Sequence, residues 1–411
     1  MRVFRCALQS IVQNKLRSVL AGFGIAWGIF LLVIFLGIGD GFRDGVMELF
    51  NAFAQKSLFV YGGQTSVAGE ELNEGTMVLF DIDVAEKVKN RYGSVVSCSS
   101  EMSSSLRVTW NGETTSSSVN GVESDYFDIR ILKIESGRGI SLLDDMRSRD
   151  VAVIGEGLQK ALFGKKSPLG QFIVIEGAPY KVIGVLSSED LFSIQERNSI
   201  YVPASSFAYN FNSEGKVQSF CLSLSENANT SEIEDDLKGY LAHLCGFDPH
   251  DEQALYVENI EAQTATFESL FHGLEVLIWI IAVCLLLSGI VGVCNVMLIM
   301  VKERTNEIGI RKAVGATSNS IISMIMAESV VITFIAGITG IVLGSFIILI
   351  VNEIVVPMLN ADIMKELKIN LPTILVAFVF LGLSGMLSGL FPALKASQIS
   401  PVDAIRYENR G

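Results

Sequence analysis

Four long windows without a charged side chain constrain the fold of this chain more than any other feature. They are Ser18–Gly39, Val276–Val301, Ser329–Asn352 and Ile369–Leu394. As helices with about 1.5 Å of rise per residue, they extend over roughly 33–39 Å, which is enough to cross a hydrocarbon core of about 30 Å. The mean hydropathy of +0.45 is also high for a soluble protein. The sequence therefore predicts four transmembrane helices.

Lys and Arg in the short flanks of the windows set the expected orientation, because such loops stay preferentially in the cytoplasm. The segment before the first window contains four bases and no acid, and the connector 302–312 contains four more bases. The connector 353–368 instead holds two Lys and three acids. We therefore expect both termini and the connector after the second span in the cytoplasm, and residues 41–271 on the opposite side.

The predicted fold class is a membrane protein with four transmembrane α-helices and a large mixed α/β extracytoplasmic domain between the first and second spans. The expected segments are a cytoplasmic amphipathic helix (1–17), spans at 18–40, 272–301, 321–352 and 369–394, an extracytoplasmic domain of two subdomains (41–271), a cytoplasmic coupling segment (302–320), a short external loop (353–368) and a cytoplasmic tail (395–411).

Residues 41–271 hold 34 acidic and 18 basic side chains. This acidic balance argues against nucleic acid and anionic lipid as ligands of the domain. Apolar runs bordered by Gly or Pro predict strands, and helical spacing predicts helices. The predicted strands are 58–61, 106–110, 151–154, 172–175, 180–186 and 199–202, and the predicted helices are 83–91, 156–163, 231–244 and 255–275.

Motifs of enzymatic chemistry are missing from the sequence. It contains no phosphate loop, nucleophile elbow or zinc-protease motif. His243, Cys245 and His250 lie close together in sequence but offer no fourth ligand at a zinc-site spacing. We assign no catalytic residue, cofactor site or metal site. Whether two of Cys98, Cys221 and Cys245 form a disulfide stays open.

The spans contain pairs of glycines one helical turn apart, which let two helices approach closely. The pairs are Gly24 and Gly28, Gly340 and Gly344, and Gly385 and Gly389. Glu328 lies early in the third hydrophobic segment, where an ionised group should face protein or water rather than lipid. Because the spans contain no second ionisable group for a proton relay, we expect Glu328 to have a structural or interface role.

The connector between the second and third spans is short and densely charged. Glu303, Glu307 and Arg311 recur at four-residue spacing, and the Glu-to-Arg order favours ion pairs on a helix. The pattern predicts a helix over Lys302–Ala316.

An apolar patch interrupts this charge. Ile310, Ala313 and Val314 share one helical face, and we expect Gly309 and Gly315 to break or bend the helix. A solvated connector needs no such patch, whereas an element that docks on a partner does.

Several separated motifs resemble one family. EIGIRKAVGAT with the following span and GITGIVLG, VAVIGEGLQKALFGKKSPLGQFIVIEGAPYKVIGVL, IYVPASSF and FPALKASQISPVDAIRYE are similar, in this order, to the permease subunits of MacB-like ABC transporters of the FtsX type. The resemblance covers essentially the whole chain. It implies a multi-pass protein of the bacterial inner membrane with a periplasmic core domain, which transmits ATP-driven closure in the cytoplasm into movement outside.

The resemblance also implies the site and the partners. The coupling residues would be Glu303, Arg304, Glu307, Gly309, Ile310, Arg311, Lys312, Ala313, Val314, Gly315 and Ala316. ATP and Mg²⁺ would bind a separate cytoplasmic ABC ATPase, since MacB carries its ATPase ahead of the first span and this chain begins shortly before it. The other implied partners are a second copy or a paralogue, membrane lipid, and a periplasmic adaptor with an outer-membrane channel.

The substrate stays open, and so do the alternative functions. The expected function is export or extrusion driven from the outer face. A lipoprotein-releasing permease is the alternative within the family, and a lipid-accessible pocket between the first and second spans would favour it. A regulator of an external partner without transport is a further alternative, and the missing catalytic motifs disfavour a membrane-anchored enzyme.

Overall fold

The computed structural model describes residues 15–187, 197–211, 215–355, 367 and 371–400. The chain divides into two compact units, one of residues 46–269 and one of the segments before and after it. The predicted cytoplasmic helix at 1–17 lies almost entirely outside the described residues, as do most of the predicted external loop at 353–368 and the end of the tail.

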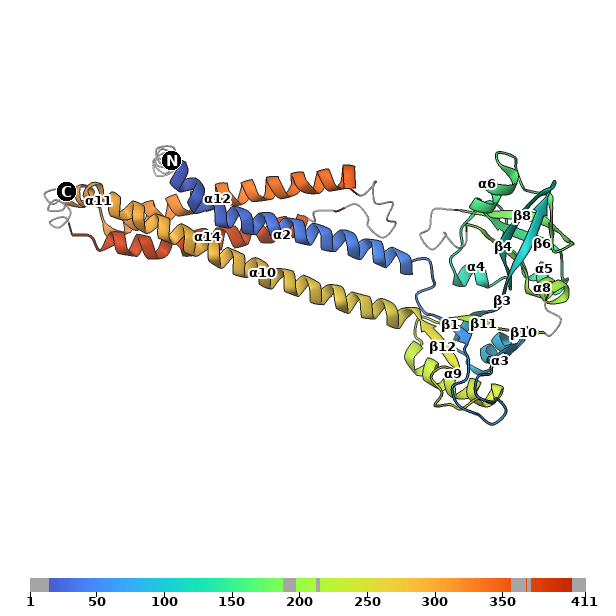
Figure 1. The fold of residues 1–411 in the computed structure, drawn as a ribbon. Coiled ribbons are helices and arrows are strands. Elements are labelled where there is room, and N and C mark those ends of the chain that lie inside the picture. Colours follow the sequence, from blue (N-terminus) through green and yellow to red (C-terminus); the bar gives the residue numbers. More distant parts are fainter. Residues whose placement is uncertain (1–14, 188–196, 212–214, 356–366, 368–370, 401–411) are drawn as a thin grey trace. The chain divides into compact units, whose positions relative to one another are not determined.

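Within the part of the chain that the structure describes, the helical unit contains four helices that are long and apolar enough to cross a membrane. They lie side by side (Figure 1). The helices of this unit are α2 (Lys15–Phe50), α10 (Ile260–Glu303), α11 (Thr305–Ala313), α12 (Ser318–Ile350) with the π-helical turn η1 (Val351–Val355), and α14 (Leu371–Ser397). The predicted fold class is confirmed. The helices α2 and α10 extend well beyond the predicted spans, because helical spacing continues past the apolar windows.

Glycines bring the backbones of these helices into contact. A Cβ atom added at Gly24 of α2 would lie 3.1 Å from the Cα of Gly289 in α10. One added at Gly340 of α12 would lie 2.4 Å from the carbonyl oxygen of Ala26 in α2. Real Cβ atoms do not approach backbone oxygen this closely, so only glycine fits at Gly340.

The end of α10 is fixed by a buried ion pair. The helix ends at Glu303, and α11 begins after Arg304. The guanidinium Nη1 of Arg304 lies 3.3 and 3.2 Å from the two carboxylate oxygens of Glu328 in α12, and Glu328 is only 5% exposed. The predicted single helix over Lys302–Ala316 is therefore wrong at Arg304, where a tertiary contact replaces helical continuity.

Residues 46–269 form an α/β unit around one ten-stranded sheet in the order β12-β1-β11-β3-β4-β9-β6-β8-β5, with β7 paired to β3 and β8. The strands are β1 (Ser57–Gly62), β2 (Phe80–Asp81), β3 (Val95–Trp110), β4 (Glu113–Val122), β5 (Ile134–Gly137), β6 (Val151–Gly155), β7 (Phe172–Ile175), β8 (Ala178–Leu186), β9 (Ser199–Pro203), β10 (Lys216–Val217), β11 (Ser219–Leu224) and β12 (Leu255–Asn259). The helices are α3 (Val84–Arg91), α4 (Tyr126–Ile129), α5 (Leu142–Met146), α6 (Glu156–Phe163), α8 (Ala204–Phe211) and α9 (Thr230–Cys245).

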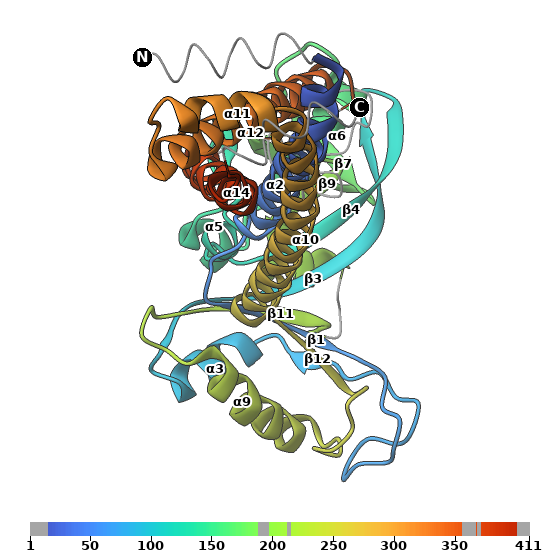
Figure 2. The ribbon, with the colours of Figure 1, turned by 90° about the vertical axis from the view of Figure 1, so that its left-hand side faces the viewer.

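Alternating side chains give this sheet two apolar faces. Leu58 and Val60 of β1 face the larger core cluster, to which α3, α6, α8 and α9 contribute. Phe59 points the other way, into a second cluster that contains Phe53 and residues of α4. The helices α3 and α9 lie side by side on their face of the sheet (Figure 2). An ion pair joins them, with Nη2 of Arg91 3.5 Å from Oδ2 of Asp236.

The sequence prediction missed several strands. The strand β4 and the first half of β3 are rich in Ser and lack a long apolar run. The helix predicted over 255–275 is wrong for its first five residues, which form β12 and pair with β1. The backbone hydrogen bonds of β1 decide this, since local spacing permits either structure.

Replacing Gly340 by Val is expected to destabilise the helical unit by about 1–3 kcal/mol, because the new side chain collides with the backbone of α2. Thermal unfolding in detergent measures the effect. The matched control is Gly382→Val in α14, since a Cβ there meets nothing within 4 Å. Equal unfolding midpoints for the two variants would contradict the assigned packing.

Replacing Glu328 by Gln is expected to cost about 2 kcal/mol, because it removes the charge that partners Arg304 in a buried position. The control is Glu307→Gln, which removes an exposed ion pair with Arg311 at 2.6 Å and should cost only about 0.5 kcal/mol. The same unfolding assay compares the two, and a larger loss for Glu307→Gln would show that the Arg304 contact is not structural.

Candidate functional site

The helix α11 presents an apolar face outward. Ile310 is 51% exposed and Val314 is 85% exposed, and Ala313 between them is exposed as well. Ile308, on the opposite side of the helix, is 2% exposed and packs in the core of the helical unit. The short helix therefore has one side anchored in the unit and an apolar side open to a partner.

Polar side chains of α11 tie it to two neighbouring helices. Arg311 donates to the sulfur of Met324 in α12 at 2.6 Å. The ammonium of Lys312 donates to the carbonyl oxygen of Ser397 at the end of α14, and to that of Ile399 at 3.0 Å. With the Arg304–Glu328 pair, α10, α11, α12 and α14 are linked at one end of the unit. A force on α11 would therefore act on three spans.

The other predicted coupling residues differ in their placement. Glu303 is the last residue of α10 and is exposed. Gly309 lies buried inside α11 and does not break it, contrary to the expectation, because it packs against the helical unit. Gly315 ends the helix with a φ of +100°, which glycine adopts without strain. Ala316 is half-buried and follows directly.

The remaining predicted glycines also lie at helix crossings. A Cβ atom added at Gly28 would lie 3.3 Å from the side chain of Leu285, and one added at Gly344 would lie 2.9 Å from the side chain of Val33.

Gly385 and Gly389 bring α14 onto α12. A Cβ atom added at Gly385 would lie 3.1 Å from the Cα of Val330, and one added at Gly389 would lie 2.7 Å from the Cβ of Ser329. Sequence reasoning missed the polar contact here. The Ser329 hydroxyl lies 2.8 Å from that of Ser388. Small residues four apart, Gly385 and Gly389, were the available signal, but the sequence does not say which helix they face.

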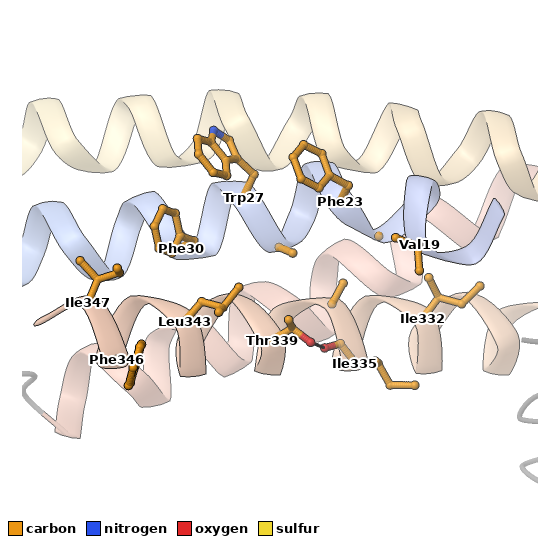
Figure 3. Close-up of a pocket in the computed structure, with 13 residues that line it drawn as sticks. Val19, Phe23, Trp27, Phe30, Ile332, Ile335, Thr339, Leu343, Phe346 and Ile347 are labelled. Carbon is orange, nitrogen blue, oxygen red and sulfur yellow. Dashed lines mark hydrogen bonds between the residues drawn. The ribbon is translucent and has the colours of Figure 1, made fainter. Parts of the chain in front are cut away.

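A cavity of about 700 Å³ lies between α2 and α12. Figure 3 shows its two rows of lining side chains, one on each helix. The lining residues are Val19, Gly22, Phe23, Ala26, Trp27, Phe30, Ile332, Ile335, Ala336, Thr339, Leu343, Phe346 and Ile347. The hydroxyl of Thr339 donates to the carbonyl oxygen of Ile335 at 2.8 Å within its own helix, so the wall offers mainly apolar surface. The cavity therefore lies between the first and third spans. The pocket that would favour a lipoprotein-releasing permease is expected between the first and second spans.

The α/β unit of residues 46–269 uses its buried polar groups for its own fold. Burial raises the pKa of Glu123 to about 7, although the backbone N–H of Ser100 donates to its carboxylate at 3.1 Å and opposes the shift. Cys98 and Cys221 are free thiols on opposite faces of the sheet, and Cys245 is also free. Among the described residues, no three His, Cys, Asp or Glu side chains are grouped to hold a metal ion.

Comparisons with known proteins agree with the two-unit architecture. Residues 18–240 match the MacB-like periplasmic core domain, and residues 279–401 match the FtsX-like permease C-terminal. The uncharacterized ABC transporter permease YknZ of Bacillus subtilis is 30% identical over 413 residues, with 98% of each chain covered.

Two further similarities concern MacB. The macrolide export ATP-binding/permease protein MacB of Bdellovibrio bacteriovorus is 29% identical over 403 residues, which are 97% of this chain and 61% of MacB. The chain thus spans about three fifths of the length of this relative. The crystal structure of the periplasmic region of MacB from Actinobacillus actinomycetemcomitans has a TM-score of 0.44 and 21% identity, and covers 53% of this chain and 95% of that one.

Family membership rests on the two family models, which together cover most of the sequence, and on the full-length match to YknZ. The chain belongs to the MacB-like, FtsX-type family of ABC transporter permeases.

Proposed function

We propose that the chain is the transmembrane subunit of an ABC transporter and passes force from a cytoplasmic ATP-binding subunit to its external unit, to drive export or extrusion of a substrate. The observation that carries this proposal is the exposed apolar face of α11 on a helix tied to three spans. A subunit that presses on this face would move the ends of α10, α12 and α14 together.

The docking surface consists of Ile310, Ala313 and Val314, with Glu303 and Glu307 at its rim. Burying apolar side chains supplies affinity, whereas rim charges mainly set association rate and salt dependence. This division predicts which substitutions in α11 will uncouple the complex.

Relatives support the choice of partner. The MacB relative is named an ATP-binding/permease protein. YknZ matches over 98% of both chains and is named a permease. We infer that ATP and Mg²⁺ bind a separate polypeptide, that this chain is not the catalytic subunit, and that it works as a dimer with a second copy or a paralogue. A periplasmic adaptor and an outer-membrane channel are the external partners that export in a bacterial inner membrane would need.

The orientation proposed from charge places residues 41–271 outside and 302–320 inside. A thiol-specific reagent that cannot cross the membrane should label Ser148→Cys and spare Asn319→Cys in intact cells. Both positions are exposed. Replacing the exposed Cys284 and the half-buried Cys245 and Cys294 by Ser removes the competing accessible thiols among the described residues. Labelling of Asn319→Cys alone would place α11 on the wrong side for a cytoplasmic ATPase.

Ala313→Asp tests the docking surface. A carboxylate pressed into an apolar contact should weaken binding of the ATP-binding subunit at least about tenfold, which corresponds to ~1.4 kcal/mol. Glu307→Lys, at the rim, should change mainly the salt dependence. Copurification and ATP hydrolysis are compared at equal expression. If Ala313→Asp keeps full coupling while Glu307→Lys loses it, α11 is a solvated connector and the docking assignment is wrong.

A further inference from the structure

The first turn of α10 is bound to two segments that are distant from it in sequence. One carboxylate oxygen of Glu261 accepts a hydrogen bond from the hydroxyl of Thr230 at 2.6 Å. The other lies 3.4 Å from the ammonium of Lys56. Thr230 is the first residue of α9, and Lys56 lies between α2 and β1. We call Lys56, Thr230 and Glu261 the junction bridge.

The burial of Thr230 and further hydrogen bonds make the junction bridge a built contact, while the side chains of Lys56 and Glu261 are 26% and 41% exposed. Thr230 is only 2% exposed. The Lys56 ammonium also donates to the carbonyl oxygen of Ala228, just before α9, at 2.7 Å. A charged group that is held by several partners in a partly buried place has few alternative positions.

A second link joins the same elements. The side-chain amide of Asn259 donates to Glu234 of α9 at 3.0 Å. Its oxygen accepts from the backbone N–H of Ala262 at 3.1 Å and so caps the start of α10. Because Asn259 already supplies the cap, Glu261 is not needed to begin the helix. Its carboxylate is available to hold α10 against α9 and the connector.

The sheet brings these elements to one place. Leu58 of β1 pairs with Asn259 of β12, so the connector that follows α2 and the strand that precedes α10 are neighbours. The junction bridge crosses this point from the connector to α9.

We propose that the junction bridge makes α9 follow α10, so that a displacement of α10 reaches the α9 side of the external unit through Glu261 and Thr230. These two are positioning residues, and the inference rests on the proposed function. Without the bridge, the Asn259–Glu234 hydrogen bond still connects the start of α10 to α9, but the first turn of α10 loses the Glu261 contact. The helix α9 stays with the sheet, because its Leu237 and Leu241 are buried in the larger core cluster.

The test measures two positions in the complex of the full chain with the ATP-binding protein that copurifies with it. Spin labels are placed singly at Ala265 in α10 or at Asp235 in α9, both exposed, and distances between the two copies are recorded with and without ATP. ATP hydrolysis is measured on the same samples. The Ala265 label reports the proposed function, and the Asp235 label reports whether α9 follows.

Matched variants separate the junction bridge from general stability. Thr230→Val replaces the hydroxyl by a methyl group and leaves the charge of α10 unchanged. Thr230→Ser keeps the hydroxyl. Glu261→Ala removes the carboxylate, and Glu268→Gln alters an exposed acid two turns further along α10. Thr230→Val and Glu261→Ala should reduce the ATP-dependent shift at Asp235 about two-fold or more, while the Ala265 shift and the hydrolysis rate persist. Thr230→Ser and Glu268→Gln should resemble the unmodified chain.

The outcomes distinguish the two proposals. If ATP moves neither label in the unmodified chain, the proposed function fails. If the Ala265 label moves but the Asp235 label does not, or if both shifts survive in Thr230→Val and Glu261→Ala, the proposed function stands and the junction bridge is overturned. Loss of the Asp235 shift in these two variants alone supports it.

Discussion

Close contact between helix backbones is the constraint on which the helical unit depends. In lipid, moving an apolar side chain from lipid contact to helix contact gains little free energy, because both surroundings are apolar. Membrane helices therefore associate through tight packing and a few polar contacts. Gly340 on Ala26 joins α12 to α2, and Gly24 on Gly289 joins α2 to α10. The helix α2 is thus the common neighbour of α10 and α12.

Polar contacts at one end of the unit add to this packing and fix the ends of the helices. The Arg304–Glu328 pair ends α10 in a defined place, and Lys312 holds α11 to the end of α14. A short helix with an exposed apolar face would otherwise be a loose connector. These contacts instead hold α11 on the helical unit, with Ile308 buried in the core and Ile310 and Val314 exposed on the other side.

The α/β unit is held together by its ten-stranded sheet. The strand β1 shares hydrogen bonds with β11 and β12, and each face of the sheet has its own apolar cluster. On one side, the ring centroids of Phe53 and Phe59 are 5.3 Å apart. The guanidinium of Arg130 lies over both rings. On the other side, Glu261 and Thr230 join α10 to α9.

The four spans, the α/β domain between the first two and the apolar face of α11 could be predicted from the sequence, because they follow from composition and from spacing within one element. The sequence also contained the motifs that identify the family. Three other features could not be predicted in this way: the interruption of the connector helix at Arg304, the strand at residues 255–259, and the contact between Glu261 and Thr230. Each of these depends on a partner far away in the chain, namely Glu328, β1 or α9, and local spacing has no access to such a partner.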